Sequence, residues 1–382
     1  MATYQALLTL TILLLLNVPL VTPCNFPAIF NFGDSNSDTG GLSAAFGAAP
    51  PPNGETFFKR PVGRYSDGRL VIDFIANSLG LPYLNAYLDS IGTNFSHGAN
   101  FATAGSTIRR ENRTLFQSGY SPFSLDVQTW QFNQFIGRSQ YVYEKGGIYR
   151  EILPTQDIFS KALYTFDIGQ NDLTSGYFSN LTTMEVIGYM PDLMQRFTNL
   201  VKVIYDLGAR NFWIHNTGPI GCLPYVLVRV PTVATKKDQI GCGKVFNEVA
   251  QLFNAKLKET VGQLRKELPS ATLIYVDVYS VKYEMFKNPG KHVCFVGFEN
   301  PLVSCCGHGG KYNYDVNAGC GATIRVNNTD ILLGKSCPDP LKKVCWDGIH
   351  YTEAANRFIF EQIADGKFSD PPVPLNSACK SL

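Results

Sequence analysis

The sequence predicts an α/β protein, a three-layer α/β/α sandwich with a central parallel sheet. Short apolar runs, rich in aromatic and β-branched residues, alternate with longer stretches whose apolar residues recur at helical spacing. Strands that alternate with helices form parallel sheets covered on both faces. Because no internal repeat or low-complexity linker interrupts this alternation, we expect one domain with long insertions.

Five apolar runs are expected to be buried strands. Each is short and is bounded by Gly, Asn, Asp or Pro, which favour turns. The runs cover residues 28–32, 98–102, 162–168, 211–215 and 271–278. Ligands of such sheets bind beyond the carboxyl ends of the strands, so the polar residues after each run are candidates for a functional site.

Four stretches are expected to be helices, at residues 69–79, 192–207, 245–268 and 352–364. The clearest is 245–268, where apolar residues from Val245 to Leu268 form one stripe against a polar face. Thr352 is expected to be the N-cap of the last helix.

Residues 1–23 are expected to be a secretory signal peptide. The apolar run at 6–21 is interrupted by Asn17 and Pro19 and is short for a membrane span of about 20 residues. Residues 2–10 contain no Lys or Arg, which departs from the usual signal pattern, and a membrane anchor is the alternative. Residues 24–382 then form the mature domain, without a stable membrane anchor and in an extracellular location.

The ten cysteines agree with an oxidising compartment, where such residues form disulfides. Cys24 and Cys379 bracket the mature chain and are a candidate pair. A metal site is the alternative for a cluster whose spacing matches no established zinc pattern, made of Cys305, Cys306, His308 and Cys320.

Four Asn-x-Ser/Thr sequons are expected to carry glycans on solvent-facing loops, at Asn94, Asn112, Asn180 and Asn327. Lys plus Arg is 33 and Asp plus Glu is 31, so no excess of positive charge points to a nucleic-acid partner. With 45% apolar and 17% charged residues, the chain is not of the disordered class.

Five residues near the strand ends and the last helix suit nucleophilic catalysis: Ser35, Gly105, Asn171, Asp347 and His350. A His can remove the proton of a serine hydroxyl, and a carboxylate on its other nitrogen fixes its tautomer. The spacing of three lets Asp347 and His350 meet in a turn. The N–H groups of Ser35 and Gly105 and the amide of Asn171 are candidate donors to an oxyanion.

Each signal also has a structural explanation. The Gly-Asp-Ser-Asn segment at 33–36 is typical of an Asx turn, residues 347–350 of a helix-cap network, and residues 171–172 of a tight turn. We expect His215 to be a core residue, and Asp38 to hydrogen-bond its own loop without a chemical role. The combination of signals favours catalysis.

Four segments carry a resemblance to a known family. FNFGDSNSDTGG around Ser35, GANFATAGS around Gly105, FDIGQND around Asn171 and WDGIHYTEAAN around Asp347 and His350 resemble the blocks of plant GDSL esterase/lipases, in the SGNH hydrolase superfamily. The resemblance implies that Ser35 is the nucleophile, His350 the base and Asp347 its orienting carboxylate. It also implies an oxyanion hole of Ser35, Gly105 and Asn171, a flavodoxin-like fold, and no cofactor.

The motif around the nucleophile departs from the family pattern, because Asn36 stands where the family has Leu. This neighbour is not expected to remove the chemistry. The resemblance runs from about residue 24 to the C-terminus and makes residues 24–382 an SGNH/GDSL hydrolase domain.

The expected function is a secreted serine carboxylic-ester hydrolase that acts on a small-molecule ester through an acyl-enzyme on Ser35. An acyltransferase with the same Ser-His-Asp site is the main alternative, in which an alcohol replaces water. A glycoside hydrolase would need two carboxylates about 5–9.5 Å apart, and no pair stands out among Asp34, Asp38, Asp172 and Asp347. A non-catalytic binding or storage glycoprotein is the remaining alternative.

Overall fold

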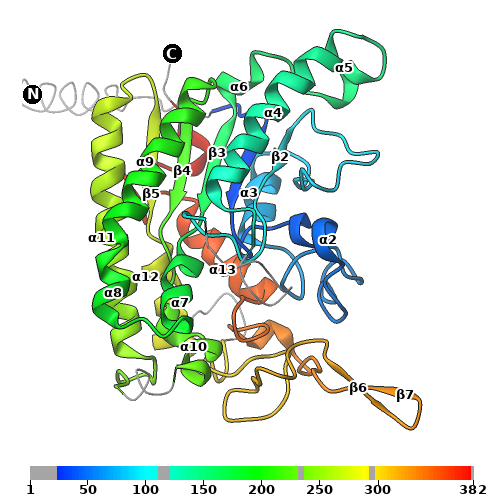
Figure 1. Cartoon of the computed structure of the whole chain (residues 1–382), viewed down its shortest axis with the longest axis vertical. Helices are drawn as coiled ribbons and strands as arrows, with labels where there is room; N and C mark the ends of the chain where they lie inside the picture. The colour runs from blue at the N-terminus through cyan, green and yellow to red at the C-terminus, as the bar shows by residue number, and fades with distance from the viewer. Residues whose placement is uncertain (1–23, 111–120, 231–235, 292–296, 380–382) are drawn as a thin grey trace, which may run out of the picture.

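In the computed structural model, the described residues are 24–110, 121–230, 236–291 and 297–379 (Figure 1). They contain a six-stranded sheet in the order β2-β1-β3-β4-β5-β8. Its strands are β1 (Ile29–Gly33), β2 (Gly98–Asn100), β3 (Leu163–Asp167), β4 (Asn211–His215), β5 (Thr272–Val276) and β8 (Ser369–Asp370). The first five are parallel, and only β8 pairs antiparallel, with β5. The α/β class and the parallel sheet are thus confirmed, and the order 2-1-3-4-5 is flavodoxin-like.

The order of the strands assigns the long helices to two layers. The chain passes from β1 to β2 in one direction and from β2 to β3 in the other, and right-handed crossovers then place the connecting helices on opposite faces. One layer contains α4 (Leu125–Tyr143), α9 (Met190–Asp206) and α11 (Lys244–Glu267), which pack against one another. The other contains α3 (Val71–Ser78), α12 (Val278–Lys287) and α13 (Glu353–Ile363) (Figure 1).

Four of the long helices were predicted within a few residues of their observed ends. In α9, for example, Leu193, Phe197, Val201 and Ile204 are fully or almost fully buried, as the apolar stripe indicates. The N-cap prediction for α13 is confirmed, because the Thr352 side chain accepts a hydrogen bond from the Ala355 N–H.

Helix α4 was not predicted, although it has 19 residues and contacts β1 and α9. Its buried face includes Gln128, Thr129 and Gln131, so no continuous apolar stripe marks it in the sequence. The Gln128 side chain accepts a hydrogen bond from the Gly33 N–H at 2.9 Å and donates one to the Gly33 carbonyl at 2.8 Å. A buried glutamine can satisfy both backbone groups at the end of β1 in a way that an apolar residue cannot.

Shorter elements complete the described part of the chain. The short helices are α2 (Gly41–Phe46), α5 (Tyr149–Ile152), α6 (Ile158–Lys161), α7 (Gln170–Phe178), α8 (Thr183–Gly188) and α10 (Pro224–Arg229). The 3₁₀ turns are Ile220–Cys222, Pro289–Lys291, Pro340–Lys342 and Leu375–Ser377. An unpredicted hairpin of β6 (Thr323–Val326) and β7 (Thr329–Leu332) projects from the body of the molecule (Figure 1).

An aromatic cluster forms the core beneath the carboxyl end of β1. The Phe32 ring stacks on the rings of Phe101 and Phe166, with centroid distances of 5.3 and 5.2 Å, and meets Phe132 edge-on at 5.5 Å. These rings come from β1, β3, α4 and the segment after β2. Dense packing of this kind gives the residues that follow β1 a rigid base.

Four disulfides link eight of the ten cysteines: Cys24–Cys379, Cys222–Cys242, Cys305–Cys337 and Cys306–Cys320. The candidate pair Cys24 and Cys379 is therefore confirmed as a disulfide. Three cysteines of the alternative metal cluster are consumed in these bonds and have no thiolate to offer a metal. Cys345 is a buried free thiol, and Cys294 lies outside the described residues.

The expected signal peptide and Asn112 also lie outside the described residues. Within the ranges that are described, no helix has both the length and the apolar character of a membrane span. Asn94, Asn180 and Asn327 are exposed, as carriers of glycans must be, and their glycosylation stays a prediction.

Candidate active site

The five residues singled out in the sequence line one cavity of about 350 Å³, at the edge where the parallel strands end: Ser35, Gly105, Asn171, Asp347 and His350. The first three follow β1, β2 and β3, and the other two precede α13. Strands β1 and β3 flank the point where the strand order reverses, which is the usual ligand position in such sheets.

Asp347 and His350 form a compact pair in the turn before α13. Asp347 Oδ1 accepts hydrogen bonds from the N–H groups of Ile349 at 2.9 Å and His350 at 2.8 Å, and Oδ2 lies 2.6 Å from His350 Nδ1. Burial by itself raises the pKa of the Asp347 carboxyl, but the imidazole and these N–H groups outweigh it and hold the pKa below its usual range. A carboxylate at Nδ1 keeps the proton there, so Nε2 is the basic nitrogen.

His350 Nε2 is the atom that this pair makes available for chemistry. It is buried and has no hydrogen-bond partner among the described residues, while its side chain lines the same cavity as Ser35. A buried polar atom without a partner is uncommon and points to a functional site.

The turn that holds the pair depends on a glycine. Gly348 has a φ of +94°, a conformation that L side chains rarely adopt, and a Cβ there would lie 2.4 Å from the Tyr314 ring. The Trp346 N–H donates to the His350 carbonyl at 2.7 Å and closes the turn. Asp347 and His350 are thereby fixed before α13 begins.

Ser35 sits in a tight turn directly after β1. Asp34 Oδ1 accepts a hydrogen bond from the Asn36 N–H at 2.9 Å, so the segment is an Asx turn as well as a candidate nucleophile turn. The turn packs closely on β3, since a Cβ at Gly33 would lie 2.4 Å from the Asp167 carbonyl oxygen. With Gln128 bound to both backbone groups of Gly33, the position of Ser35 is well determined.

Three N–H donors border the cavity near Ser35. The backbone N–H groups of Ser35 and Gly105 donate to no acceptor within the described ranges. The Asn171 amide donates one hydrogen to the Ser106 carbonyl at 2.9 Å, which fixes its orientation and leaves its second hydrogen. All three residues line the cavity, so together they suit an oxyanion hole.

Asp38 joins two of the segments that carry these donors. Its buried carboxylate accepts hydrogen bonds from the N–H groups of Gly40, Gly41 and Leu42 in its own loop and from Ala104 beside Gly105. The prediction that Asp38 bonds its own loop was correct, but the link to the second loop was missed.

Asp172 has a similar role, which sequence reasoning missed. It accepts hydrogen bonds from the N–H groups of Ile108, at 3.0 and 2.9 Å, and Arg109, and so links α7 to the segment after Gly105. The only sequence signal for Asp38 and Asp172 was that each lies close to a predicted site residue, Ser35 and Asn171 respectively.

A second set of buried ionisable groups lies behind Ser35. His215 Nδ1 is 3.3 Å from Asp167 Oδ2, and the Trp213 indole N–H donates to His215 Nε2 at 3.1 Å. Because Nε2 accepts this bond, Nδ1 carries the proton and points it at Asp167. His215 is thus a satisfied core residue, as predicted.

Asp34 and Asp167 differ in pKa although both are buried. Burial and the neighbouring Asp167 raise the pKa of Asp34 to about 7, against the opposing effect of the Asn36 hydrogen bonds and Lys282. Burial also raises the pKa of Asp167, but Lys282 and His215 outweigh it and hold that pKa below its usual range. Asp167 is therefore ionised near neutral pH, whereas Asp34 holds its proton below about pH 7 and loses it above.

The outer wall of the cavity mixes aromatic and polar groups. The Arg229 guanidinium lies 3.8 Å from the centroid of the Phe178 ring, and Tyr65 packs its ring 5.4 Å from that of His350. Gly319 and Cys320 also line the cavity, and Cys320 forms the disulfide with Cys306. Binding sites for organic ligands combine apolar surface with a few polar groups in this way.

The parallel α/β sheet thus brings Ser, His and Asp side chains to one cavity at its carboxyl edge. Residues 29–363 match the family model described as GDSL-like Lipase/Acylhydrolase. The protein belongs to this family.

Curated relatives extend over almost the whole chain. "GDSL esterase/lipase ACHE" of Zea mays is 62% identical over 94% of this chain and 90% of its own length. "Esterase" of Hevea brasiliensis is 62% identical over 93% of this chain and 90% of its own length. "Alpha-L-fucosidase 3" of Arabidopsis thaliana is 59% identical over 94% and 93%. The family and the esterase relatives make the protein a carboxylic-ester hydrolase.

Proposed function

We propose that the protein is a secreted serine hydrolase that cleaves small-molecule carboxylic esters through an acyl-enzyme on Ser35. The observation that supports the proposal is the shared cavity, which is lined by Ser35, by His350 with its unpartnered Nε2, and by the residues that carry the N–H donors. Gly105 and Asn171 supply donors beside the serine. No metal or cofactor is required for this chemistry.

In the first half-reaction, His350 Nε2 takes the hydroxyl proton while Ser35 Oγ forms a bond to the ester carbonyl carbon. The carbonyl oxygen becomes an oxyanion, which the Ser35 and Gly105 N–H groups and the Asn171 amide stabilise. As the ester bond breaks, the imidazolium returns its proton to the departing alcohol. Asp347 stabilises the imidazolium through Nδ1 and remains a carboxylate.

In the second half-reaction, His350 takes a proton from water, and the resulting hydroxide attacks the acyl carbon. The tetrahedral intermediate collapses, Ser35 Oγ recovers the proton, and the acid is released. Each proton that His350 accepts is returned, so the enzyme is regenerated.

Ser35→Ala tests the proposal, with Ser37→Ala as the matched control. Ser37 is a buried serine of the same turn that does not line the catalytic cavity. We expect the first variant to lose p-nitrophenyl ester turnover and labelling by a serine-directed phosphonate, and the control to keep both. Full turnover by Ser35→Ala would contradict the assignment of the nucleophile.

Acyl transfer to an alcohol uses the same residues, and the acyl-enzyme then decides between water and a second alcohol. Assays with an added acceptor alcohol distinguish the two. We expect free acid as the main product, and an ester of the added alcohol as the main product would favour transfer.

The name of the Arabidopsis relative makes glycoside hydrolysis a second candidate. That reaction needs two carboxyl groups about 5–9.5 Å apart beside the sugar bond. Asp315 and Asp347 are the carboxylates that line the cavity, and Asp347 is already committed to His350 and Ile349. An aryl α-L-fucoside that Ser35→Ala still hydrolyses would favour this candidate over ester hydrolysis.

Secretion is supported by the predicted signal peptide at 1–23 and by the four disulfides, which form in oxidising compartments. Expression of the full chain in plant cells tests it. We expect the protein in the culture medium, starting near residue 24 and losing mass on treatment with an N-glycosidase. Retention inside the cell with residues 1–23 intact would contradict secretion.

A further inference from the structure

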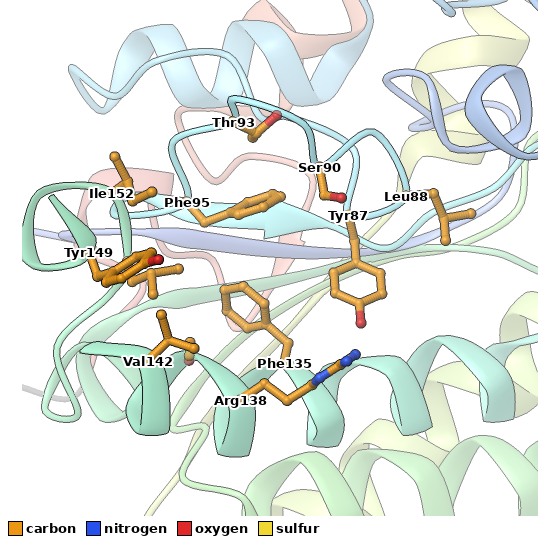
Figure 2. Close-up of a pocket in the computed structure, with 12 residues that line it drawn as sticks. Tyr87, Leu88, Ser90, Thr93, Phe95, Phe135, Arg138, Val142, Tyr149 and Ile152 are labelled. Atoms are coloured by element: carbon orange, nitrogen blue, oxygen red, sulfur yellow. The ribbon is translucent and has the colours of Figure 1, made fainter. Parts of the chain in front are cut away.

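A second cavity of about 470 Å³ lies apart from the catalytic cavity and shares no lining residue with it. It is open to solvent on one side and is bordered by the segment 87–95 that leads to β2, by the second half of α4, and by α5 with the residue that follows it (Figure 2). Cavities of about 300–1,000 Å³ are those that hold small organic ligands. The catalytic chemistry uses no part of it.

The floor of this cavity is aromatic and rigid. Phe95 and Phe135 are 7% and 5% exposed, and their rings meet edge-on with centroids 5.6 Å apart. Phe135 also packs against the core rings of Phe30 and Phe101. The Phe95 N–H donates to the Ile152 carbonyl at 2.7 Å and joins two walls. Such a cavity exists before a ligand arrives, so binding involves little loss of conformational freedom.

The cavity lining carries a single positive charge, and this charge lies at one end of the cavity. Arg138 is the only residue among those that line the cavity with a charged side chain; it is exposed and forms no ion pair or hydrogen bond with the described residues. In Figure 2 its guanidinium extends toward the end of the cavity near the Tyr87 hydroxyl, whereas Val142, Tyr149 and Ile152 lie toward the other end. The cavity therefore has a cationic, hydrogen-bonding end and an apolar end.

We propose that this cavity binds an apolar monocarboxylate, namely a free fatty acid. Its carboxylate pairs with Arg138 in the fork geometry that a guanidinium offers, beside the Tyr87 hydroxyl. Its hydrocarbon chain lies over Phe95 and Phe135 toward Ile152. The proposal does not depend on the proposed function, because no step of it uses Ser35.

Two features of binding follow from this arrangement. Each added methylene raises affinity about fourfold until the apolar end is full, after which affinity levels off. A fatty alcohol of the same length binds about threefold more weakly than the acid, because it lacks the ion pair with the exposed Arg138 side chain.

The test titrates the full-length Ser35→Ala protein with a fluorescent polyene fatty acid and displaces it with saturated acids and alcohols. Arg138→Gln is expected to bind the acid about threefold more weakly and the alcohol unchanged, and Arg138→Lys to recover part of the loss. Arg150→Gln is the matched control, since Arg150 lies on α5 outside the lining, with its guanidinium 5.9 Å from the Tyr143 ring centroid.

A second variant tests the position of the chain independently of charge. Val142 is partly exposed, so Val142→Trp can fill the apolar end without disturbing the core. We expect this variant to bind long-chain acids more weakly and to bind short-chain acids as the parent protein does. If Arg138→Gln and Val142→Trp both bind long-chain acids as the parent does, or if Arg150→Gln weakens binding as much as Arg138→Gln, the proposal is overturned.

Discussion

Replacement of Asp34 by Asn is expected to change how the stability of the protein depends on pH. The carboxyl is fully buried beside Asp167, and its pKa of about 7 compares with 3.8 for an unperturbed aspartate. Between these values the unfolded chain has lost the proton and the folded protein still holds it. The folded state then binds more protons, so the free energy of unfolding falls as pH rises.

The size of this effect follows from the pKa difference. One unit corresponds to about 1.4 kcal/mol, so the contribution of Asp34 falls by at most about 1.4 kcal/mol per pH unit and by about 4 kcal/mol in all. The charged groups that act on Asp34 in the folded protein are Asp167 and Lys282, and both remain in the variant. The introduced asparagine is neutral at every pH and keeps an oxygen that accepts from the Asn36 N–H. The variant therefore lacks the decrease in the free energy of unfolding that Asp34 causes as pH rises.

Urea unfolding of both proteins at pH 4.5, 6 and 8, with disulfides intact, measures the difference. We expect similar stabilities at pH 4.5 and a variant more stable by about 3 kcal/mol at pH 8, since about 1 kcal/mol of the total effect falls below pH 4.5. Asp347→Asn should change the pH dependence of stability in the opposite direction, because the pKa of Asp347 in the folded protein is lowered. Its contribution to stability is present above the unfolded pKa and is lost as pH falls through the folded pKa. If wild type and Asp34→Asn gave parallel stability curves from pH 4.5 to 8, the assignment of a raised pKa to Asp34 would be wrong.

Three further variants test other parts of the site. Asn171→Ala should lower kcat about 10²–10³-fold with a smaller change in KM, since the oxyanion exists only in the transition state, and steady-state kinetics on one ester will check this. Asp38→Ala leaves four buried N–H groups without their acceptor, so unfolding experiments should show a loss of several kcal/mol, and a loss below about 1 kcal/mol would contradict the bridging role. The double variant Cys306→Ser, Cys320→Ser opens a crosslink over 14 residues and should cost about 3 kcal/mol. Kinetics should also show a raised KM, because Cys320 lines the catalytic cavity.

The sequence predicted those parts of the fold whose pattern is set by local burial. All five strand predictions overlap the observed strands, because each strand of a covered parallel sheet is buried on both sides and is therefore mostly apolar. Helix α4 shows the limit of the method. Gln128 is buried in it for a hydrogen-bonding reason that depends on Gly33, 95 residues earlier in the chain. Periodicity of apolar residues cannot report such a contact.

The antiparallel strand β8 and the β6–β7 hairpin were missed for related reasons. Strand β8 (Ser369–Asp370) has two residues, which is too few to show an alternation of apolar and polar side chains. Its pairing with β5 depends on the tertiary structure and not on its own sequence. All residues of the hairpin strands are exposed, so no alternation of burial selects one face.

The residues of the candidate site also fall into two groups, those that the local sequence predicts and those that depend on tertiary contacts. A reacting group must be one of a few residue types, so Ser35, Asp347 and His350 stand out in a sequence, and the last two are only three residues apart. A positioning group needs only a hydrogen-bonding atom of suitable reach, and its partner is set by the tertiary structure. Asp38 meets the Ala104 N–H across 66 residues of chain, and Asp167 meets His215 across 48. The reacting residues can therefore be predicted from their residue types and spacing in the sequence. The residues that position them can be identified only from the tertiary structure, because their partners lie far away in the chain.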